Sequence, residues 1–579
     1  MAQSTVENVF RQKRTFSIPH YQRDYAWNKK NLEDLWEDLK EAHENRGDSQ
    51  GHFLGTIVLA PNPQNPDVMD IIDGQQRSTT LFLLRYALNQ HTSNPDFNNN
   101  LFFRKDGEPT LQVAPKNKEF FCKLIEKIGK GSIDSEFEKQ CKTKAQLNLF
   151  EVTKTILDKI GSIGKDQEKI EAYLNTLDKM IILELEEKDS SKAIRLFQTV
   201  NDRGVKLEIL DKLKALLILY SNKYCEGVLD EKINERFGKL FEIIEQISTS
   251  KAAASIADQH FAEEAETRIF NYHAYYYKDF GHYAHGANEA YFLLKEHIKK
   301  IQKEERHKLQ QWLDDYSSGL LKFAETFLAL IERTKTDMEL FKLFFILKIK
   351  PLFYPTLVRL EINELLDQEY LRLIAQAEII FFGLDSERKA KAYSLIGILD
   401  KNDFKQMIID VSRSTSETRK YRNLATALET KINNSYKWGD SFHYLFFTYH
   451  QDNISLSDCR NILEQDKKLK LFPIEIEHIV PQNAVENGSL EQYGFIDVVD
   501  FDNLKDTFGN LLSLEASLNR EASDKTPVGK QSIYERSKIQ YNRQLAYQQD
   551  FIRFGKDQII KRNEEVLKWL TEDFFADFL

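Results

Sequence analysis

The pattern of apolar and polar positions near the N-terminus predicts two strands followed by a helix. Residues 53–59 and 68–72 are apolar and β-branched, and the turn between them is rich in proline and asparagine, which is typical of paired strands. The pattern of residues 78–88 predicts a helix that starts directly after a glycine-containing loop. The first part of the chain therefore combines strands with helices.

The pattern becomes helical in the middle of the chain. Between residues 231 and 430 apolar positions recur at steps of three and four, which predicts helices nearly throughout. Aromatic residues follow the same steps over residues 312–331, and we expect this stripe to be core rather than a cofactor site. Close to the C-terminus, isoleucines at 474 and 476 alternate with glutamates, which predicts a half-buried strand that Pro481 ends.

These patterns predict an α+β protein of three domains. A length of 579 residues suits three or four domains of about 150 residues each. We place the domains at residues 1–230, which are mixed, 231–430, which are mostly helical, and 431–579, where a short strand pair lies within helices. We expect the helical region to couple the two outer domains.

Composition indicates a soluble protein of a reducing compartment. Apolar residues make up 41% of the chain and charged residues 29%, which excludes a disordered protein. The four cysteines lie far apart and form no Cys-x-x-Cys pair, so we expect neither disulfides nor a cysteine-type zinc site. No secretory signal and no membrane span is recognisable, so we expect a cytoplasmic protein without a membrane partner. The cysteines are Cys122, Cys141, Cys225 and Cys459.

The segment from 475 to 525 carries the strongest chemical signal. Glu477 and His478 lie at the end of the predicted strand, and Asn510 and Asn519 follow, nine positions apart. Carboxylate and amide oxygens are hard ligands that suit Mg²⁺ or Mn²⁺, which keep most of their waters and grip a phosphate. We therefore expect Glu477 and Asn519 to bind the metal, and His478 to take a proton from the attacking water.

These side chains converge only if the chain bends at the end of the strand. Neighbours in a regular strand face opposite ways, so Glu477 and His478 require a bend, for which the Val480–Pro481 step supplies a reason. The short amide of Asn510 is suited to bridge backbone groups of the loop and to hold the histidine in place. Glu475 is a lesser candidate ligand.

The alternative is a hydrogen-bonded strand histidine followed by two turn asparagines. A lone Glu-His pair favours that alternative, but the full set E-H-I-V-P-Q, G-N-L-L-S-L and N-R favours a nuclease site because several features coincide. The net charge of −10 is not that of a general nucleic-acid coat protein. Residues 505–562 nevertheless contain 11 Lys and Arg against 7 Asp and Glu, which is compatible with DNA. Lys525 and Lys530 are candidate phosphate contacts.

A second candidate site lies between the predicted strand and helix of the N-terminal part. Such a junction offers free backbone N–H groups and a positive dipole end, which suit a phosphate. Gly74 permits close approach, Arg77 can pair with phosphate oxygens, and Asp73 can hold a metal or orient water. The alternative is a helix-capping loop with a salt-bridged arginine. The candidate nucleotide-binding residues are Asp73, Gly74, Gln75, Gln76, Arg77, Ser78 and Thr79.

Two further polar segments accompany this site. Residues 18–27 place aromatic side chains beside an arginine, a surface able to stack on bases, and residues 197–207 supply a second polar turn. The candidate contacts to DNA or to its bases in these segments are Tyr21, Gln22, Arg23, Tyr25, Trp27, Asn201 and Arg203.

The C-terminal segment resembles the HNH (ββα-metal) nucleases, and is close to the HNH domain of CRISPR effector nucleases. The resemblance implies that His478 is the general base, that Glu477 and Asn519 bind the metal, and that Asn510 is structural. The acid is glutamate where aspartate is commoner in the family, and the extra methylene puts the metal distance in doubt. Lys525, Lys530 and Tyr534 follow at spacings that resemble the C-terminal nuclease module of modification-dependent restriction enzymes, and we expect phosphate contacts or packing from them.

The N-terminal segment resembles the corresponding module of the GmrSD-type, modification-dependent (type IV) restriction enzymes. The basis is the D-G-Q-Q-R loop at 73–77, with F-L-G-T-I at 53–57 before it, and the loop is similar to the phosphate-binding loop of the ParB/sulfiredoxin-like fold. The resemblance covers both ends of the chain and leaves the helical middle unmatched. It implies binding and hydrolysis of a nucleoside triphosphate, and cleavage of modified phage DNA.

The sequence therefore predicts a nucleotide-regulated, metal-dependent endonuclease that acts on modified double-stranded DNA. Two alternatives stay open, namely a nucleotidase whose C-terminal module only binds DNA, and a ParB-like DNA-binding or partition protein whose HNH module does not cleave. The recognised modification, the preferred nucleotide and the question of a homodimer also stay open. There is no Walker motif, so a nucleotide site is not a P-loop.

Overall fold

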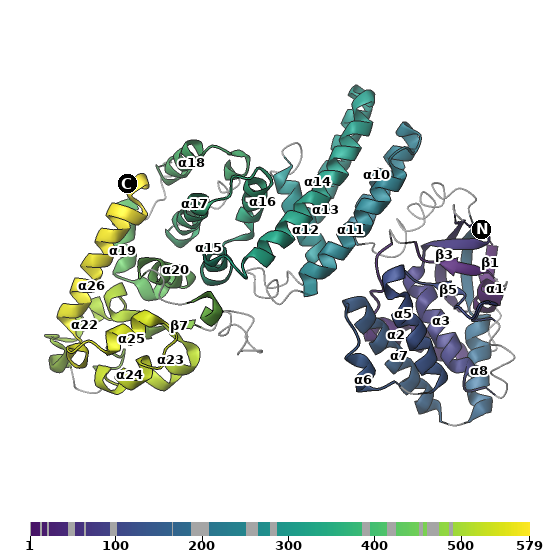
Figure 1. Ribbon diagram of the computed structural model, residues 1–579, viewed down its shortest axis with the longest axis horizontal. Coiled ribbons are helices and arrows are strands. Elements are labelled where there is room, and N and C mark those ends of the chain that lie inside the picture. Colours follow the sequence, from purple (N-terminus) through teal and green to yellow (C-terminus); the bar gives the residue numbers. More distant parts are fainter. Residues whose placement is uncertain are drawn as a thin grey trace. The chain divides into compact units, whose positions relative to one another are not determined.

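The computed structural model divides into two compact units. The N-terminal unit comprises Met1–Glu245 and Leu294–Lys322, and the C-terminal unit comprises Gln246–Leu293 and Phe323–Leu579 (Figure 1). The division into three domains stays a prediction. The structure describes residues 2–11, 14–19, 22–44, 52–62, 65–92, 101–131, 133–164, 166–186, 208–249, 264–277, 286–384, 394–413, 424–450, 455–459, 474–485 and 490–579.

The N-terminal unit contains a mixed six-stranded sheet with the strand order β1-β6-β3-β4-β2-β5. Strand β3 pairs antiparallel with β4 and parallel with β6. The expected α+β class is confirmed; the likeness to ParB and sulfiredoxin stays a prediction. The strands are β1 (Ala2–Thr5), β2 (Thr15–Ser17), β3 (Phe53–Pro61), β4 (Val68–Asp73), β5 (Leu111–Gln112) and β6 (Ile181–Glu186).

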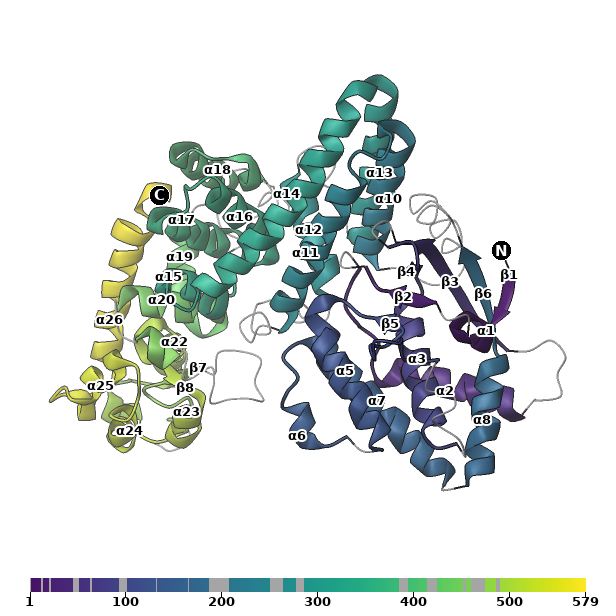
Figure 2. The same ribbon diagram turned by 45° about the vertical axis from the view of Figure 1, so that its right-hand side comes forward.

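Helices cover this sheet and bury its apolar side chains. Helices α2, α3, α7 and α8 lie beside one another under the strands in both views (Figures 1 and 2). The core between them is rich in leucine, isoleucine and phenylalanine. The helices are α1 (Val6–Arg11), α2 (Lys29–Glu44), α3 (Gln75–Asn89), α5 (Pro115–Gly129), α6 (Ser135–Glu138), α7 (Lys144–Ile163), α8 (Gln167–Lys179) and α10 (Ile209–Cys225).

The predicted strand pair and the helix after it are confirmed, but the helix begins earlier than expected. Helix α3 begins at Gln75 rather than at residue 78, so Gly74 alone separates it from β4. The chain turns within this one residue because Gly74 has a φ of +84°, which side chains disfavour. A Cβ atom at Gly74 would also lie 3.0 Å from the carbonyl oxygen of Thr56.

The helical middle is confirmed for the residues that the structure describes between 231 and 430, which contain no strand. The aromatic stripe of α14 is buried as expected from Tyr316 onward, and Trp312 is half-buried. The helices here are α11 (Asp230–Thr249), α12 (Ala265–Tyr276), α13 (Ala287–Glu304), α14 (Arg306–Arg333), α15 (Met338–Phe341), η2 (Lys342–Leu347), η3 (Pro351–Phe353), α16 (Tyr354–Ile362), α17 (Gln368–Glu378), η4 (Ile379–Leu384), α18 (Lys401–Arg413) and α19 (Leu424–Ile432).

A two-stranded antiparallel sheet lies among the last helices of the C-terminal unit. Strand β7 (Ile474–His478) pairs with β8 (Leu511–Glu515), and α23 (Ala516–Ala522) follows directly and packs on both strands. The other helices are η6 (Ser435–Trp438), α20 (Asp440–Tyr449), η7 (Leu490–Tyr493), α22 (Val498–Leu504), η8 (Phe508–Asn510), α24 (Pro527–Tyr534), α25 (Gln540–Ala546), η9 (Phe551–Arg553), α26 (Lys556–Trp569), η10 (Leu570–Phe574) and η11 (Ala576–Phe578).

Every residue of β8 is buried, including the polar Ser513 and Glu515. Helix α20 contacts β8 in addition to α23, so helices cover the strand pair on more than one side. Among the described residues, no helix is long and apolar enough to cross a membrane.

Gly509 lets α26 pack directly against the segment before β8. A Cβ atom at Gly509 would lie 2.1 Å from the carbonyl oxygen of Ile559 in α26. The side chain of Asn563, one turn further along α26, accepts a hydrogen bond of 2.6 Å from the Gly509 N–H. The glycine of the G-N-L-L motif is therefore required by the close approach of two backbones.

We expect Gly509→Ala to destabilise the C-terminal unit by about 3 kcal/mol, because α26 must move away from η8. Calorimetric thermal unfolding measures the loss. Gly161→Ala is the matched control, since a Cβ atom at that position in α7 meets no heavy atom within 4 Å. The control should be neutral or slightly more stable than the parent. Equal stability of both variants would contradict this account of Gly509.

Candidate functional site

His478 lies at the end of β7, and its ring is held by polar partners. Its Nε2 atom is 2.9 Å from Oδ1 of Asp506, and the side-chain amide of Gln482 donates a hydrogen bond of 3.3 Å to the same oxygen. The Tyr436 ring lies beside it, with ring centroids 4.9 Å apart. The side chain of His478 is only 9% exposed. The imidazole therefore has a fixed orientation and a carboxylate partner.

Burial keeps the His478 imidazole neutral. Loss of hydration lowers its pKa, and the hydrogen bond and charge of Asp506 oppose that shift. A neutral imidazole that is hydrogen-bonded to a carboxylate can accept a proton at its other ring nitrogen. Our sequence analysis did not identify Asp506, although an acidic residue four positions before Asn510 was a visible signal.

Asn510 bridges the backbone on the far side of the loop, as its short amide suggested. Its Oδ1 atom accepts a hydrogen bond of 2.8 Å from the Val480 N–H, and its Nδ2 atom donates to the carbonyl oxygens of Val480 and Lys505, at 3.0 and 2.8 Å. The side chain is completely buried. Asn510 thus fixes the turn that directly follows His478.

Glu477 and Asn519 were predicted to bind one metal ion together, but their side chains contact different groups. The Nζ atom of Lys530 lies 2.7 Å from Oε1 of Glu477, and the Tyr534 hydroxyl donates a hydrogen bond of 2.8 Å to the same oxygen. Strand β7 stays regular through His478, so the expected bend comes one residue too late to bring Glu477 and His478 together. Burial raises the pKa of Glu477, while Lys530 and Tyr534 oppose this.

Phosphate contact or packing was expected of Lys530, and its fully buried side chain packs inside the protein and cannot contact DNA. Its position in α24 places it on the same face as Tyr534, one turn later, and this face packs toward β7. Lys525 is exposed and donates a hydrogen bond of 2.7 Å to the Glu521 carbonyl oxygen. Lys525 thus remains a candidate phosphate contact.

Asn519 pairs instead with Glu475. The Asn519 amide donates a hydrogen bond of 2.7 Å to Oε2 of Glu475, and both side chains lie at the surface. Glu475 and Glu477 lie on one face of β7 and His478 on the other. The described residues contain no cluster of three histidine, cysteine or acidic side chains that fits a metal ion.

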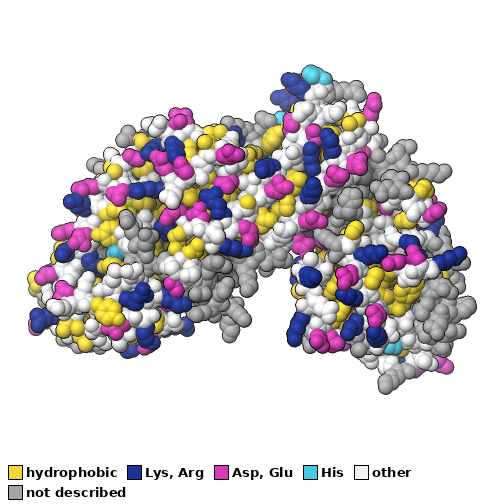
Figure 3. Space-filling view, viewed as in Figure 1, with side chains coloured by type: hydrophobic (Ala, Val, Ile, Leu, Met, Phe, Trp, Pro, Cys, Tyr) yellow, Lys and Arg dark blue, Asp and Glu magenta, His cyan; other side chains and the backbone are white. Residues whose placement is uncertain are grey.

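The basic residues of the last part of the chain are interspersed with acidic ones. On the face of the C-terminal unit seen in Figure 3, Lys and Arg side chains alternate with Asp and Glu. Several form ion pairs, among them Arg536 with Glu521 and Lys556 with Asp500. The local excess of positive charge therefore forms no continuous basic stretch on this visible face.

In the N-terminal unit, the D-G-Q-Q-R motif forms the start of α3. The Gly74 cap provides no side chain to bond the first N–H groups of the helix. The Oε1 atom of Gln75 and the hydroxyl of Ser78 are buried and have no hydrogen-bond partner among the described residues. Thr79 is buried and donates to the Gln75 carbonyl oxygen at 2.8 Å. Such a helix start suits an anion.

Arg77 lies over the backbone of strand β3. Its Nη1 atom donates a hydrogen bond of 3.0 Å to the Thr56 carbonyl oxygen. A Cβ atom at Gly55, which has a φ of +112°, would lie 2.8 Å from the guanidinium carbon. Burial lowers the pKa of Arg77, and the negative charge of Asp73 opposes this. The F-L-G-T-I and D-G-Q-Q-R motifs are thus parts of one structure.

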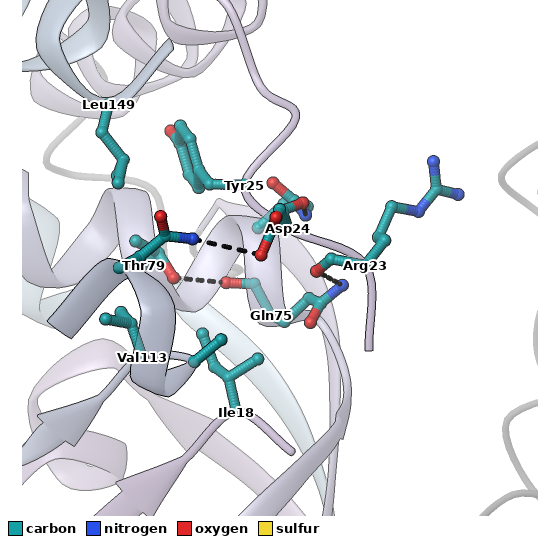
Figure 4. A pocket seen from close by; sticks show the side chains of 11 residues that line it. Ile18, Arg23, Asp24, Tyr25, Gln75, Thr79, Val113 and Leu149 are labelled. Atoms are coloured by element: carbon teal, nitrogen blue, oxygen red, sulfur yellow. Dashed lines mark hydrogen bonds between the residues drawn. The ribbon is translucent and has the colours of Figure 1, made fainter. Parts of the chain in front are cut away.

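The two glutamines of the motif hold residues 22–27. Gln76 accepts a hydrogen bond of 2.7 Å from the Ala26 N–H and donates one of 2.9 Å to the Asp24 carbonyl oxygen. Gln75 donates to the Arg23 carbonyl oxygen at 3.2 Å. A small, solvent-open pocket with a cavity volume of about 20 Å³ lies beside them (Figure 4). It is lined by Ile18, Arg23, Asp24, Tyr25, Gln75, Gln76, Thr79, Val113, Ala114, Asn117 and Leu149.

Most of the described residues that were expected to contact bases have partners inside the N-terminal unit instead. The prediction that Tyr25 stacks on bases is wrong, because it is buried and its hydroxyl lies 2.6 Å from that of Thr80. Arg23 forms an ion pair with Asp211 in α10. Gln22 donates to the Ile72 carbonyl oxygen at 3.0 Å, and Trp27 packs against the core. The candidates Tyr21, Asn201 and Arg203 lie outside the described residues.

Comparisons with known proteins now identify the family. The family model described as the N-terminal domain of GmrSD restriction endonuclease matches residues 6–218. The model described as the C-terminal domain of GmrSD restriction endonucleases matches residues 400–569. The chain belongs to the GmrSD restriction endonucleases. A comparison with curated proteins finds no match.

Membership in the GmrSD family makes the chain a restriction endonuclease that acts on modified DNA. The N-terminal match contains the start of α3 with Gly55 and Arg77, and the C-terminal match contains His478, Asp506 and Asn510. Both candidate sites therefore lie inside the parts that define the family.

We expect Gly55→Ala to destabilise the N-terminal unit by about 3 kcal/mol and to displace Arg77, because a Cβ atom adds a clash to a strained backbone. Gly107→Ala is the matched control. Its φ of +84° is also positive, but a Cβ atom there meets no heavy atom within 4 Å. That variant should lose only about 1 kcal/mol, the cost of the backbone conformation alone. Thermal unfolding of both proteins measures the difference, and equal losses would contradict the contact between Gly55 and Arg77.

Proposed function

We propose that the C-terminal unit is an HNH-type nuclease in which His478 activates the attacking water. The observation that supports this most directly is the ring of His478, fixed by Asp506 at the end of the first strand of a β7-β8-α23 unit. The same order of two strands and a helix is expected of a ββα nuclease. If His478 were only a hydrogen-bonded strand histidine, its contact with Asp506 would have no role in function.

The proposed reaction needs only one proton transfer at His478. With Nε2 donating to Asp506, the lone pair of the ring is on Nδ1, which takes a proton from water. The resulting hydroxide attacks the phosphorus, and the bond from phosphorus to the leaving sugar oxygen breaks. That oxygen takes a proton from solvent. Asp506 stabilises the imidazolium that forms, as a carboxylate partner of a histidine base does.

The metal part of the proposal needs a revised set of ligands. Glu477 does not fit a divalent ion, because its carboxylate is already matched by the buried ammonium of Lys530 and a second cation would be repelled. The exposed Glu475 and the half-buried Asn519 are oxygen donors, which suit a hydrated Mg²⁺ or Mn²⁺. When bound, such an ion would neutralise charge on a phosphate. No step above depends on it.

We further propose that the start of α3 binds the phosphates of a nucleoside triphosphate. The start of the helix, where no side chain caps the first N–H groups, suits phosphate oxygens. The carboxylate of Asp73, next to Arg77, is placed to orient a water against the terminal phosphate. Nucleotide hydrolysis would then regulate DNA cleavage, with double-stranded DNA and nucleotide as the two partners.

We expect His478→Ala to lower the rate of DNA cleavage at least 100-fold, in line with the loss of a general base. Digestion of matched phage DNAs that differ only in modification measures the rate, with and without Mg²⁺. His307→Ala is the control, since His307 is an exposed histidine in α14. Cleavage by His478→Ala at the parental rate would overturn the assignment.

We expect Asp73→Asn to lower nucleoside triphosphate hydrolysis at least 100-fold while nucleotide affinity changes less than threefold, because the amide keeps the shape of the carboxylate. Phosphate release and equilibrium binding, measured with each of the four common triphosphates, test the two parts separately. Asp67→Asn, an exposed aspartate just before β4, is the matched control. Full hydrolysis by Asp73→Asn would contradict its role, and unchanged DNA cleavage would contradict the coupling.

A further inference from the structure

A buried group of three polar side chains lies behind the catalytic strand. Glu477 in β7 is 4% exposed, and both Lys530 and Tyr534 in α24 are completely buried. Oε1 of Glu477 lies 2.7 Å from the Lys530 ammonium and accepts a hydrogen bond of 2.8 Å from the Tyr534 hydroxyl. The two residues of α24 are four positions apart, so they reach Glu477 from one face of the helix.

The ammonium of Lys530 also contacts the catalytic residue itself. Its Nζ atom donates a short hydrogen bond to the main-chain carbonyl oxygen of His478. The next residue, Ile479, donates its N–H to the Asn510 carbonyl oxygen at 2.8 Å. The peptide unit after His478 is therefore held on both sides, by Lys530 at its oxygen and by Asn510 at its nitrogen.

We infer that Lys530 is a positioning residue that aims the imidazole of His478, and that Glu477 is the charge partner of Lys530 rather than a metal ligand. This inference rests on the proposed nuclease function of His478. A lysine with no exposure cannot reach a DNA phosphate, so its charge acts inside the protein. Glu477 compensates that charge, because a buried ammonium without a counter-ion is strongly unfavourable.

The position of the His478 carbonyl decides the position of the ring. The carbonyl and the imidazole belong to one residue at a strand end, where β7 makes no further pair with β8. Without the Lys530 donor, the peptide unit is held only at its nitrogen, by the Asn510 carbonyl oxygen. It can then tilt about that hydrogen bond, and the ring moves relative to Asp506. A displacement of about 1 Å in a catalytic group costs on the order of 100-fold in rate.

The double variant Glu477→Gln/Lys530→Met tests this inference. It removes both charges together and keeps a hydrogen-bond acceptor for Tyr534, so it should unfold within a few degrees of the parent protein. We expect its kcat for DNA cleavage to fall at least tenfold with KM for DNA changed less than twofold, because the His478 carbonyl has lost its donor. A parental kcat in a folded double variant would show that Lys530 only balances Glu477, and would overturn the inference.

Lys525→Met is a matched comparison from the same part of the chain. Lys525 is exposed, so a loss of phosphate contact there raises KM and leaves kcat unchanged. A double variant that raises KM in the same manner would mean that Lys530 acts through DNA binding, which also overturns the inference. His478→Ala distinguishes failure of this inference from failure of the proposed function, because full activity of that variant would mean that His478 is not the base at all.

Metal binding gives a second readout, independent of cleavage and of the stability of the double variant. Mn²⁺ binding to His478→Ala and to His478→Ala/Tyr534→Phe, each in complex with uncut DNA, is measured by electron paramagnetic resonance. The Tyr534 variant removes one hydrogen bond to Glu477 and leaves the ion pair. We expect the same Mn²⁺ affinity in both, including no binding in either. A tenfold change would show that Glu477 holds the ion.

Discussion

The hydrogen bonds between the side chain of Asn510 and the backbone of Val480 fix the geometry on which the candidate nuclease site depends. They join points 30 positions apart in the chain. Closing a flexible loop of that length costs about 3 kcal/mol, whereas a hydrogen bond contributes about 1 kcal/mol. The ladder between β7 and β8 must therefore close the loop, and Asn510 decides the direction in which the chain leaves His478.

The same division of labour holds at the start of α3. Gln76 and Arg77 were expected to face a ligand, yet the side chains of both form hydrogen bonds with the backbone of neighbouring segments. Gly55 and Gly74 make these contacts possible, because a side chain at either position would collide with Arg77 or with β3. The motif residues thus build the surface, and the backbone N–H groups of the helix start are left to meet an anion.

The strands and the main helices followed from local patterns, whereas side-chain partners did not. Apolar runs and turn residues predicted β3, β4 and β7, and Pro481 correctly marked the end of β7. The start of α3 was missed because a single glycine with positive φ replaced the expected loop. Partners such as Asp506 and His478, 28 positions apart, depend on how the loop folds back, which no local pattern determines.

Lys530 shows why charge counts mislead at this site. The charge of Lys530 was counted in the basic excess of residues 505–562, which is compatible with DNA contact. Its side chain, however, lies on the buried face of α24 together with Pro527, Ile533 and Tyr534. The spacing of these apolar neighbours was the signal that the lysine points inward. A count of charges carries no information about direction, whereas the periodicity of a helix does.

The arrangement around His478 constrains how cleavage can be regulated. The imidazole, its carboxylate partner Asp506, and the residues that hold its backbone all belong to the C-terminal unit. Buried charges such as those of Glu477 and Lys530 cost stability, so a geometry built on them is assembled during folding and not by a later signal. In the proposed mechanism, control by nucleotide or by DNA modification therefore acts on the delivery of DNA to a base that is already in place.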